Sequence, residues 1–279
     1  MLMVVTFLLA SFLVSPANRR VVSPNLTSGI ESFKIPSESG AEIAAWLMPC
    51  MNAKATVLLL HPNRKDRSVM LKRADLLCNA GYASLMIDFQ GHGESPGEII
   101  TAGYRERFDV LAAIKFIRQR FPEQKIAVIG CSLGGAATLM AEPKGIDVLV
   151  LESVYPTITE AINNRLSMYV GPLRHILGPA LFLQFQMRLG ISPSQLRPID
   201  HLATIGCPVL IASGDCDRHT TLSETRRMFG AARSPKQLLV FEGAKHQDLL
   251  SYDPDKYQQV IEFLDANLSP SSTRKSESR

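Results

Sequence analysis

Residues 125–141, KIAVIGCSLGGAATLMA, decide how this chain folds. The apolar run at 125–129 predicts a buried strand, and residues 136–142 predict a helix. Between them, the spacing Gly130-x-Ser132-x-Gly134 predicts a tight strand-to-helix turn that raises Ser132 above a sheet. Glycine fits such a turn because it has no Cβ to clash with the neighbouring backbone. The backbone N–H of Leu133 would then lie at a helix N-terminus, where it can stabilise developing negative charge.

The rest of the chain alternates strands and helices around this turn. Turn-forming residues at 37–40 predict a hairpin of strands 31–36 and 42–48, and the continuous apolar run at 55–60 predicts a strand buried on both faces. Further strands are predicted at 82–89, 146–151, 208–212 and 237–241, and helices at 68–80, 104–120, 222–232 and 255–268. This alternation is typical of an α/β fold with a doubly wound, mostly parallel central sheet.

The alternation also defines the domain organisation. A main domain is predicted over 31–268, and the apolar, helix-like residues 152–205 interrupt it as a small helical cap. Residues 1–30 form an N-terminal apolar segment and linker. The Ser-rich tail at 269–279 is predicted to be disordered.

Composition excludes several classes of function. The 279 residues are 46% hydrophobic and 20% charged with a net charge of +4, which describes a globular protein without a nucleic-acid-binding stripe. The five cysteines are odd in number and lie in or beside apolar segments, which fits a reducing compartment better than a disulfide framework. No metal-binding motif is present, and no cofactor is expected.

The N-terminal run LMVVTFLLASFLV at 2–14 is shorter than a relaxed transmembrane helix, which needs about 17 to 25 residues. Three interpretations stay open. The run is a membrane tether with Arg19-Arg20 holding the domain on the cytoplasmic side, a cleaved signal of a secreted or periplasmic protein, or a mis-assigned start or packed segment.

A serine nucleophile at position 132 needs a base, and position in the fold selects it. Chemistry in an open α/β sheet occurs in the loops at the carboxyl ends of strands. His246 follows the last predicted strand in a short glycine-containing loop. His175 and His201 belong to the cap and its exit, and His92 lies in a glycine-flanked turn, so His246 is the candidate base.

The acid that orients this histidine is expected after the strand at 208–212, where two carboxylates compete. Asp215 directly follows a glycine turn and is typical of a turn-forming residue. Asp217 lies farther along the loop, where it can reach the histidine of the next strand. Asp217 is therefore the predicted acid, and Asp215 remains the alternative.

An oxyanion hole needs a second backbone donor besides Leu133, and it should come from the loop after strand 55–60. Pro62 has no N–H, so the next donor, Asn63, is the candidate. The glycine-rich segment DFQGHGES at 88–95 ends another strand. We expect it to fix the backbone beneath the site and not to take part in the chemistry.

Residues from about 31 to 268 resemble the α/β-hydrolase superfamily. The order Ser132, Asp217, His246 matches the nucleophile, acid and base order of that family. Gly-x-x-Asp at 214–217 and Gly-Ala-Lys-His at 243–246 match its acid and histidine loops. The likeness is greatest to a short-cap branch that contains monoacylglycerol-lipase-like, acyl-aminopeptidase-like and membrane-anchored serine hydrolases.

Two segments depart from the family pattern. DFQGHGES at 88–95 resembles the family's Asp-x-Arg-Gly-x-Gly-x-Ser segment, but Gln90 replaces the common arginine. His61-Pro62 stands where relatives commonly carry His-Gly, which bears directly on the oxyanion geometry around Asn63.

Motif and resemblance together imply a serine hydrolase that cleaves acyl bonds, with a carboxylic ester as the expected substrate. The catalytic residues would be Ser132, His246 and Asp217, with the N–H groups of Leu133 and Asn63 as the oxyanion hole. The apolar cap favours a small-molecule acyl substrate with an apolar portion. The alternatives are a serine peptidase or acyltransferase on the same triad, or a non-catalytic small-molecule receptor.

Overall fold

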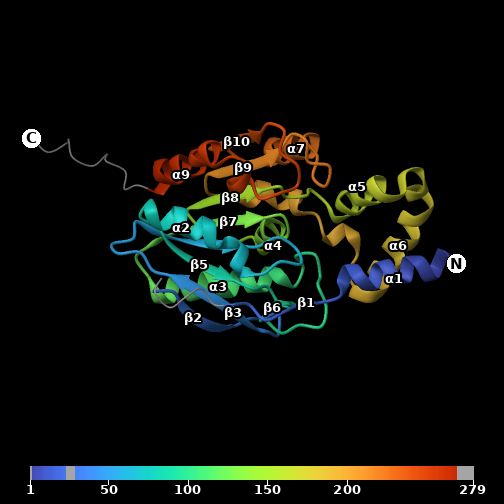
Figure 1. Cartoon of the computed structure of the whole chain (residues 1–279), viewed down its shortest axis with the longest axis horizontal. Coiled ribbons are helices and arrows are strands. Elements are labelled where there is room, and N and C mark those ends of the chain that lie inside the picture. The colour runs from blue at the N-terminus through green and yellow to red at the C-terminus, as the bar shows by residue number, and fades with distance from the viewer. Residues whose placement is uncertain (1, 23–28, 269–279) are drawn as a thin grey trace, which may run out of the picture.

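The computed structural model describes residues 2–22 and 29–268, so the tail predicted at 269–279 lies outside the described residues. The main strands are β2 (Glu31–Pro36), β3 (Glu42–Met48), β4 (Ala55–Leu60), β5 (Ala83–Ile87), β7 (Lys125–Cys131), β8 (Val148–Glu152), β9 (Val209–Gly214) and β10 (Lys236–Phe241). Within the described ranges they form one sheet in the order β10-β9-β8-β7-β4-β5-β3-β2 (Figure 1). The β2–β3 and β3–β5 pairs are antiparallel, and the other pairs of neighbours are parallel.

Helices cover both faces of this sheet. One face packs against α3 (Glu106–Arg120), α4 (Leu133–Ala141) and α7 (Leu222–Ala231), and the other against α2 (Leu71–Asn79), α8 (Leu249–Tyr252) and α9 (Pro254–Leu268). Side chains alternate between the faces of a strand. In β4, Leu58 and Leu60 therefore enter the first core, and Val57 and Leu59 the second. This double burial explains why β4 is apolar except at Thr56, whose buried hydroxyl donates to Gln124 at 2.6 Å.

The cap consists mainly of α5 (Ile158–Val170) and α6 (Arg174–Leu189), which follow β8 as predicted from residues 152–205. α1 (Leu2–Val14) lies against α6, and the three helices form a lobe at one end of the molecule (Figure 1). The N–H of Ile100 donates to the carbonyl of Val14 at 2.8 Å. β1 (Ala17–Asn18) then pairs with β6 (His92–Gly93). The boundary predicted at residue 30 thus separates segments that pack together.

Of the three interpretations of the N-terminal run, packing on the domain is the arrangement in this structure. No helix in the ranges 2–22 and 29–268 combines the length and the apolar character needed to cross a membrane.

The predicted α/β fold with a doubly wound, mostly parallel sheet is confirmed, and the strands at 31–36, 42–48 and 55–60 begin and end at the predicted residues. The helix predicted at 68–80 is shorter. It is preceded by a 3-10 turn over Arg67–Met70, because the Asp66 carboxylate accepts the N–H of Ser68 at 3.0 Å and caps that turn.

Candidate active site

Ser132 lies at the sharp turn between β7 and α4, at the carboxyl end of a central strand. Its φ of +50° is unusual for a residue with a Cβ and marks the strained conformation of a nucleophile elbow. A Cβ at Gly130 would lie 2.6 Å from the backbone of Gly135, and one at Gly134 would lie 2.5 Å from the carbonyl oxygen of Leu60. Only glycine fits both positions, which explains the Gly-x-Ser-x-Gly spacing.

His246 and Asp217 come together from the loops after β10 and β9, as the sequence predicted. The His246 Nδ1 lies 2.7 Å from Asp217 Oδ2. Asp217 is 3% exposed and also accepts from the N–H of His219, the N–H of Thr220 and the Thr220 hydroxyl, at 2.7 to 2.9 Å. Burial opposes ionisation of Asp217, but these donors outweigh it and hold its pKa below the usual value. The carboxylate is therefore ionised and can fix the imidazole with Nδ1 as the donor.

Asp215, the alternative acid, has a different position. It is exposed, and its Oδ1 accepts the N–H of Gly243 at 2.7 Å, so it ties the acid loop to the histidine loop. Within the described residues it makes no hydrogen bond or ion pair with His246. The geometry thus favours Asp217 over Asp215 as the acid that orients His246. Asp215 caps backbone N–H groups, as its position in a turn indicated.

His219 is a site residue that the sequence analysis did not single out. Its ring stacks on His246, with centroids 4.8 Å apart and planes inclined by 29°. Burial, together with the positive charge of Arg165, lowers the pKa of His219. A neutral ring stacked on His246 restricts the orientation of its imidazole without adding a second positive charge beside it.

Ser132 lines two hollows. The larger is a cavity of about 590 Å³ whose lining includes Ser132, His246 and His219 together with polar and charged side chains. The smaller is an apolar hollow of about 70 Å³ lined by Leu133 and by side chains of the cap and of α1, namely Leu13, Tyr155, Ile158, Ala161, Ile162 and Phe185. Ser132, Asn63 and Arg165 line both hollows.

Asn63 and Leu133, the predicted oxyanion donors, line hollows that Ser132 also lines. As the first residue of α4, Leu133 has no acceptor one turn earlier for its N–H. The loop that carries Asn63 is fixed by His61, which is fully buried. His61 Nδ1 donates to the carbonyl of Pro62 at 2.8 Å, and its Nε2 accepts the N–H of Phe89 at 3.2 Å. Burial lowers the pKa of His61, which keeps this neutral tautomer.

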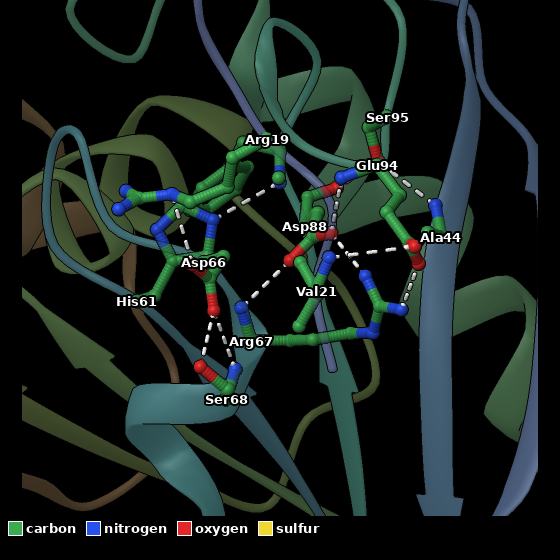
Figure 2. A network of polar contacts seen from close by, with 12 residues as sticks. Arg19, Val21, Ala44, His61, Asp66, Arg67, Ser68, Asp88, Glu94 and Ser95 are labelled. Carbon is green, nitrogen blue, oxygen red and sulfur yellow. Dashed lines mark hydrogen bonds and ion pairs between the residues drawn. The ribbon is translucent and has the colours of Figure 1, made fainter. Parts of the chain in front are cut away.

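A polar network holds this loop against the glycine-rich segment after β5. Figure 2 shows Arg67 pointing to both Asp88 and Glu94, and Asp88 accepting the backbone N–H groups of Arg67 and Glu94 at 2.6 and 2.8 Å. The Ser95 hydroxyl donates to the carbonyl of Asp88 and accepts the N–H of Ala44, both at 2.8 Å. Residues 88–95 therefore fix backbone beneath the site, as expected from their glycines.

A second buried cluster lies at the carboxyl end of β8. Arg73 of α2 contacts Glu152 Oε2 at 2.6 Å, and Tyr257 of α9 donates to Glu152 Oε1 at 2.5 Å. Arg73 also pairs with Asp248, two residues after His246. All three of Arg73, Glu152 and Tyr257 are at most 2% exposed. The cluster joins the histidine loop to β8, and nothing in the sequence pattern indicated it.

Over the residues that the structure describes, no group of three or more His, Cys, Asp or Glu side chains is placed to hold a metal ion. The chemistry available at Ser132 is that of a serine, a histidine and a carboxylate with backbone donors.

Comparisons with known proteins agree with this geometry. The family model described as "Serine aminopeptidase, S33" matches residues 51–179. An uncharacterised protein of Bacillus subtilis, YqkD, is 24% identical over 241 residues, which cover 84% of this chain and 79% of that protein.

Solved structures share the fold. An esterase of Pyrococcus furiosus, Pf2001, superimposes with a TM-score of 0.74 at 22% identity and covers 92% of this chain and 99% of its own. The esterase domain of a Rhodothermus marinus protein has a TM-score of 0.61 at 18% identity and covers 86% of this chain and all of its own. With the sheet order and the turn at Ser132, these matches show that the chain has the α/β-hydrolase fold.

Proposed function

We propose that this protein is a serine esterase that cleaves carboxylic esters through an acyl-enzyme. One observation carries the proposal. Ser132, on a strained turn, and His246, held by Asp217 at 2.7 Å, line the same cavity. The esterase names of the structural neighbours are consistent with an ester substrate.

The arrangement supports the following steps. His246 Nε2 takes the proton of the Ser132 hydroxyl while Oγ attacks the ester carbonyl carbon. The N–H groups of Leu133 and Asn63 donate to the oxyanion, and Asp217 stabilises the imidazolium. The C–O bond then breaks, the alcohol leaves with the proton from His246, and water releases the acid by the same sequence.

A fluorophosphonate probe tests the nucleophile, because it phosphonylates only activated serines. We expect it to label the wild-type protein on the peptide that contains Ser132 and to leave Ser132→Ala unlabelled. Label on the peptide of Ser153, a serine that also lines the cavity, would refute the assignment. Hydrolysis of p-nitrophenyl butyrate by the wild type and its loss in Ser132→Ala complete the test.

The same preparation separates the rival functions. Release of p-nitroaniline from aminoacyl anilides without ester hydrolysis would favour a peptidase, in line with the description of the matched family model. Ester cleavage that depends on an added alcohol acceptor would favour an acyltransferase. A protein that binds but neither reacts with the probe nor turns over would be a receptor.

A further inference from the structure

The larger cavity contains more positive than negative side chains. Arg64, Lys65, Arg73 and Arg165 line it, against the carboxylates of Glu152 and Asp248. Both carboxylates are paired with Arg73. The other cations of the cavity have no carboxylate within ion-pair distance in the part of the chain that the structure describes.

These remaining cations differ in how many of their N–H donors already make hydrogen bonds within the protein. The Arg64 guanidinium donates to the carbonyls of Phe12 and Ser15 at 3.0 and 3.1 Å. Arg165, on the cap helix α5, makes one hydrogen bond among the described residues, to the carbonyl of Ala161 at 2.8 Å. A guanidinium has five N–H donors, so most donors of Arg165 are available to a ligand.

The carboxylates nearest to Arg165 are held by other groups. Asp217 accepts from His246, and Glu224 accepts from the side-chain amide of Asn164 at 2.9 and 3.0 Å. Burial lowers the pKa of Arg165 although Asp217 and Glu224 raise it, and arginine remains charged nonetheless. A charged guanidinium that lines a cavity and has no direct counter-ion is available to pair with an anionic ligand.

Two further polar groups at the cavity lack partners. The Ser153 hydroxyl is buried, at 7% exposure, and makes no hydrogen bond in the described residues, and neither does the buried Nδ1 of His219. Lys65 lies exposed on the same lining. The unoccupied groups are thus mainly hydrogen-bond donors, which suit an acceptor with negative charge.

The smaller hollow at Ser132 indicates which end of the substrate carries that charge. Its lining comes mostly from apolar side chains of the cap and α1 and suits an acyl chain. Every charged lining residue other than Arg165 lines the larger cavity alone, which therefore suits the alcohol portion. We propose that the substrate is an ester whose alcohol portion carries an anionic group, a carboxylate or a phosphate, and that Arg165 recognises this group. The proposal rests on the proposed esterase function and names the substrate class of that site.

Two near-isosteric esters test the specificity. Para-carboxyphenyl butyrate is anionic, and para-carbamoylphenyl butyrate is its neutral counterpart. The measured quantity is the ratio of kcat/KM for the anionic ester to kcat/KM for the neutral one, each corrected for alkaline hydrolysis. We expect a ratio above one in the wild type and a fall of about tenfold to hundredfold in Arg165→Gln, the range for loss of a charged hydrogen bond. Arg165→Lys should restore part of the ratio, and added salt should lower it in the wild type.

Arg174→Gln is the matched control, because it removes the same charge from the cap at a residue that lines neither hollow. Its ratio should equal that of the wild type. A wild-type ratio of one or less, or equal ratios in the wild type and Arg165→Gln, would overturn the proposal. So would equal falls in Arg165→Gln and Arg174→Gln.

A binding measurement separates failure of this proposal from failure of the esterase function. Calorimetry with the amide analogues para-butanoylaminobenzoate and para-butanoylaminobenzamide needs no turnover. We expect tighter binding of the benzoate and loss of this preference in Arg165→Gln. If neither ester is hydrolysed but the preference is found, the anion site stands and the esterase function fails. If the wild type shows no preference for the benzoate, the anion site is refuted.

Discussion

Asp217→Asn should remove most of the turnover while the protein stays folded. The Asp217 carboxylate accepts from His246 Nδ1, from the backbone N–H groups of His219 and Thr220, and from the Thr220 hydroxyl. Both backbone donors go to Oδ1, and His246 goes to Oδ2. An asparagine can keep its carbonyl oxygen on the two backbone donors, which leaves its NH₂ group 2.7 Å from His246.

This swap fixes the wrong tautomer of the imidazole. With an NH₂ group opposite, His246 Nδ1 must become the acceptor, and the ring proton moves to Nε2. Nε2 can then no longer take the proton of Ser132. The same replacement in serine proteases lowers kcat by about 10⁴-fold, and we expect a loss of that order here. Unfolding free energy should fall by only about 1–3 kcal/mol, the cost of weakening a charged hydrogen bond.

Asp215→Asn is the matched control for this prediction. Asp215 is exposed, and its single backbone contact, to the N–H of Gly243, can be kept by an asparagine oxygen. Its kcat should stay within about twofold of the wild type, as for other surface changes. Initial rates on p-nitrophenyl butyrate and thermal melts of both variants provide the comparison. If Asp215→Asn is inactive and Asp217→Asn retains most of the activity, the acid is assigned to the wrong residue.

Three further predictions concern stability and the acyl side of the site. Arg73→Met leaves Glu152 buried without its cation, which should lower the free energy of unfolding by about 3–5 kcal/mol. The double variant Arg73→Met/Glu152→Gln should recover part of this loss, and thermal unfolding measures both variants. Burial raises the pKa of Asp109 to about 6 from 3.8, so the folded state keeps this proton up to a higher pH than the unfolded state does. Urea titrations should then show the stability of the wild type relative to Asp109→Asn falling as pH rises from about 4 to 6, and a constant difference would contradict this. On p-nitrophenyl esters of increasing chain length, kcat/KM should rise by up to about fourfold per methylene and then level off. In Ile162→Ala the levelling should occur at a longer acyl chain. A steady fall in kcat/KM from acetate onward would refute an apolar acyl hollow.

The part of the fold that the sequence predicts well depends on neighbours along the chain. β4 is apolar at every position except Thr56 because both faces are buried, and its limits follow from that run. The turn at Ser132 is local in part: the backbone of Gly135 requires a glycine at 130, whereas the carbonyl of Leu60 in the neighbouring strand β4 requires one at 134. Helix starts are less certain, as the capping carboxylate of Asp66 shows, because capping depends on side-chain orientation.

The surroundings of the triad could not be predicted in the same way, because they join distant segments. Arg73, Glu152 and Tyr257 belong to three different elements and meet only when the sheet and its helices are assembled. Nothing in the sequence pattern singles out His219, and only the path of the loop after β9 brings its ring onto His246. Packing of α1 was one of three interpretations that the sequence left open for residues 2–14, and only the assembled structure shows that Leu13 lines the apolar hollow next to Ser132.

The arginines of the cap region show why packing, and not residue type, determines which side chain can bind a ligand. Arg197 pairs with Asp200, three residues later, a contact that the sequence alone could suggest. Arg188 packs over the ring of Phe7, and Arg174 donates to the hydroxyl of Ser167. Arg165 alone among these four lines the cavity of Ser132. Under the proposed anion recognition, the free donors of Arg165 would restrict the substrate class more than the triad does.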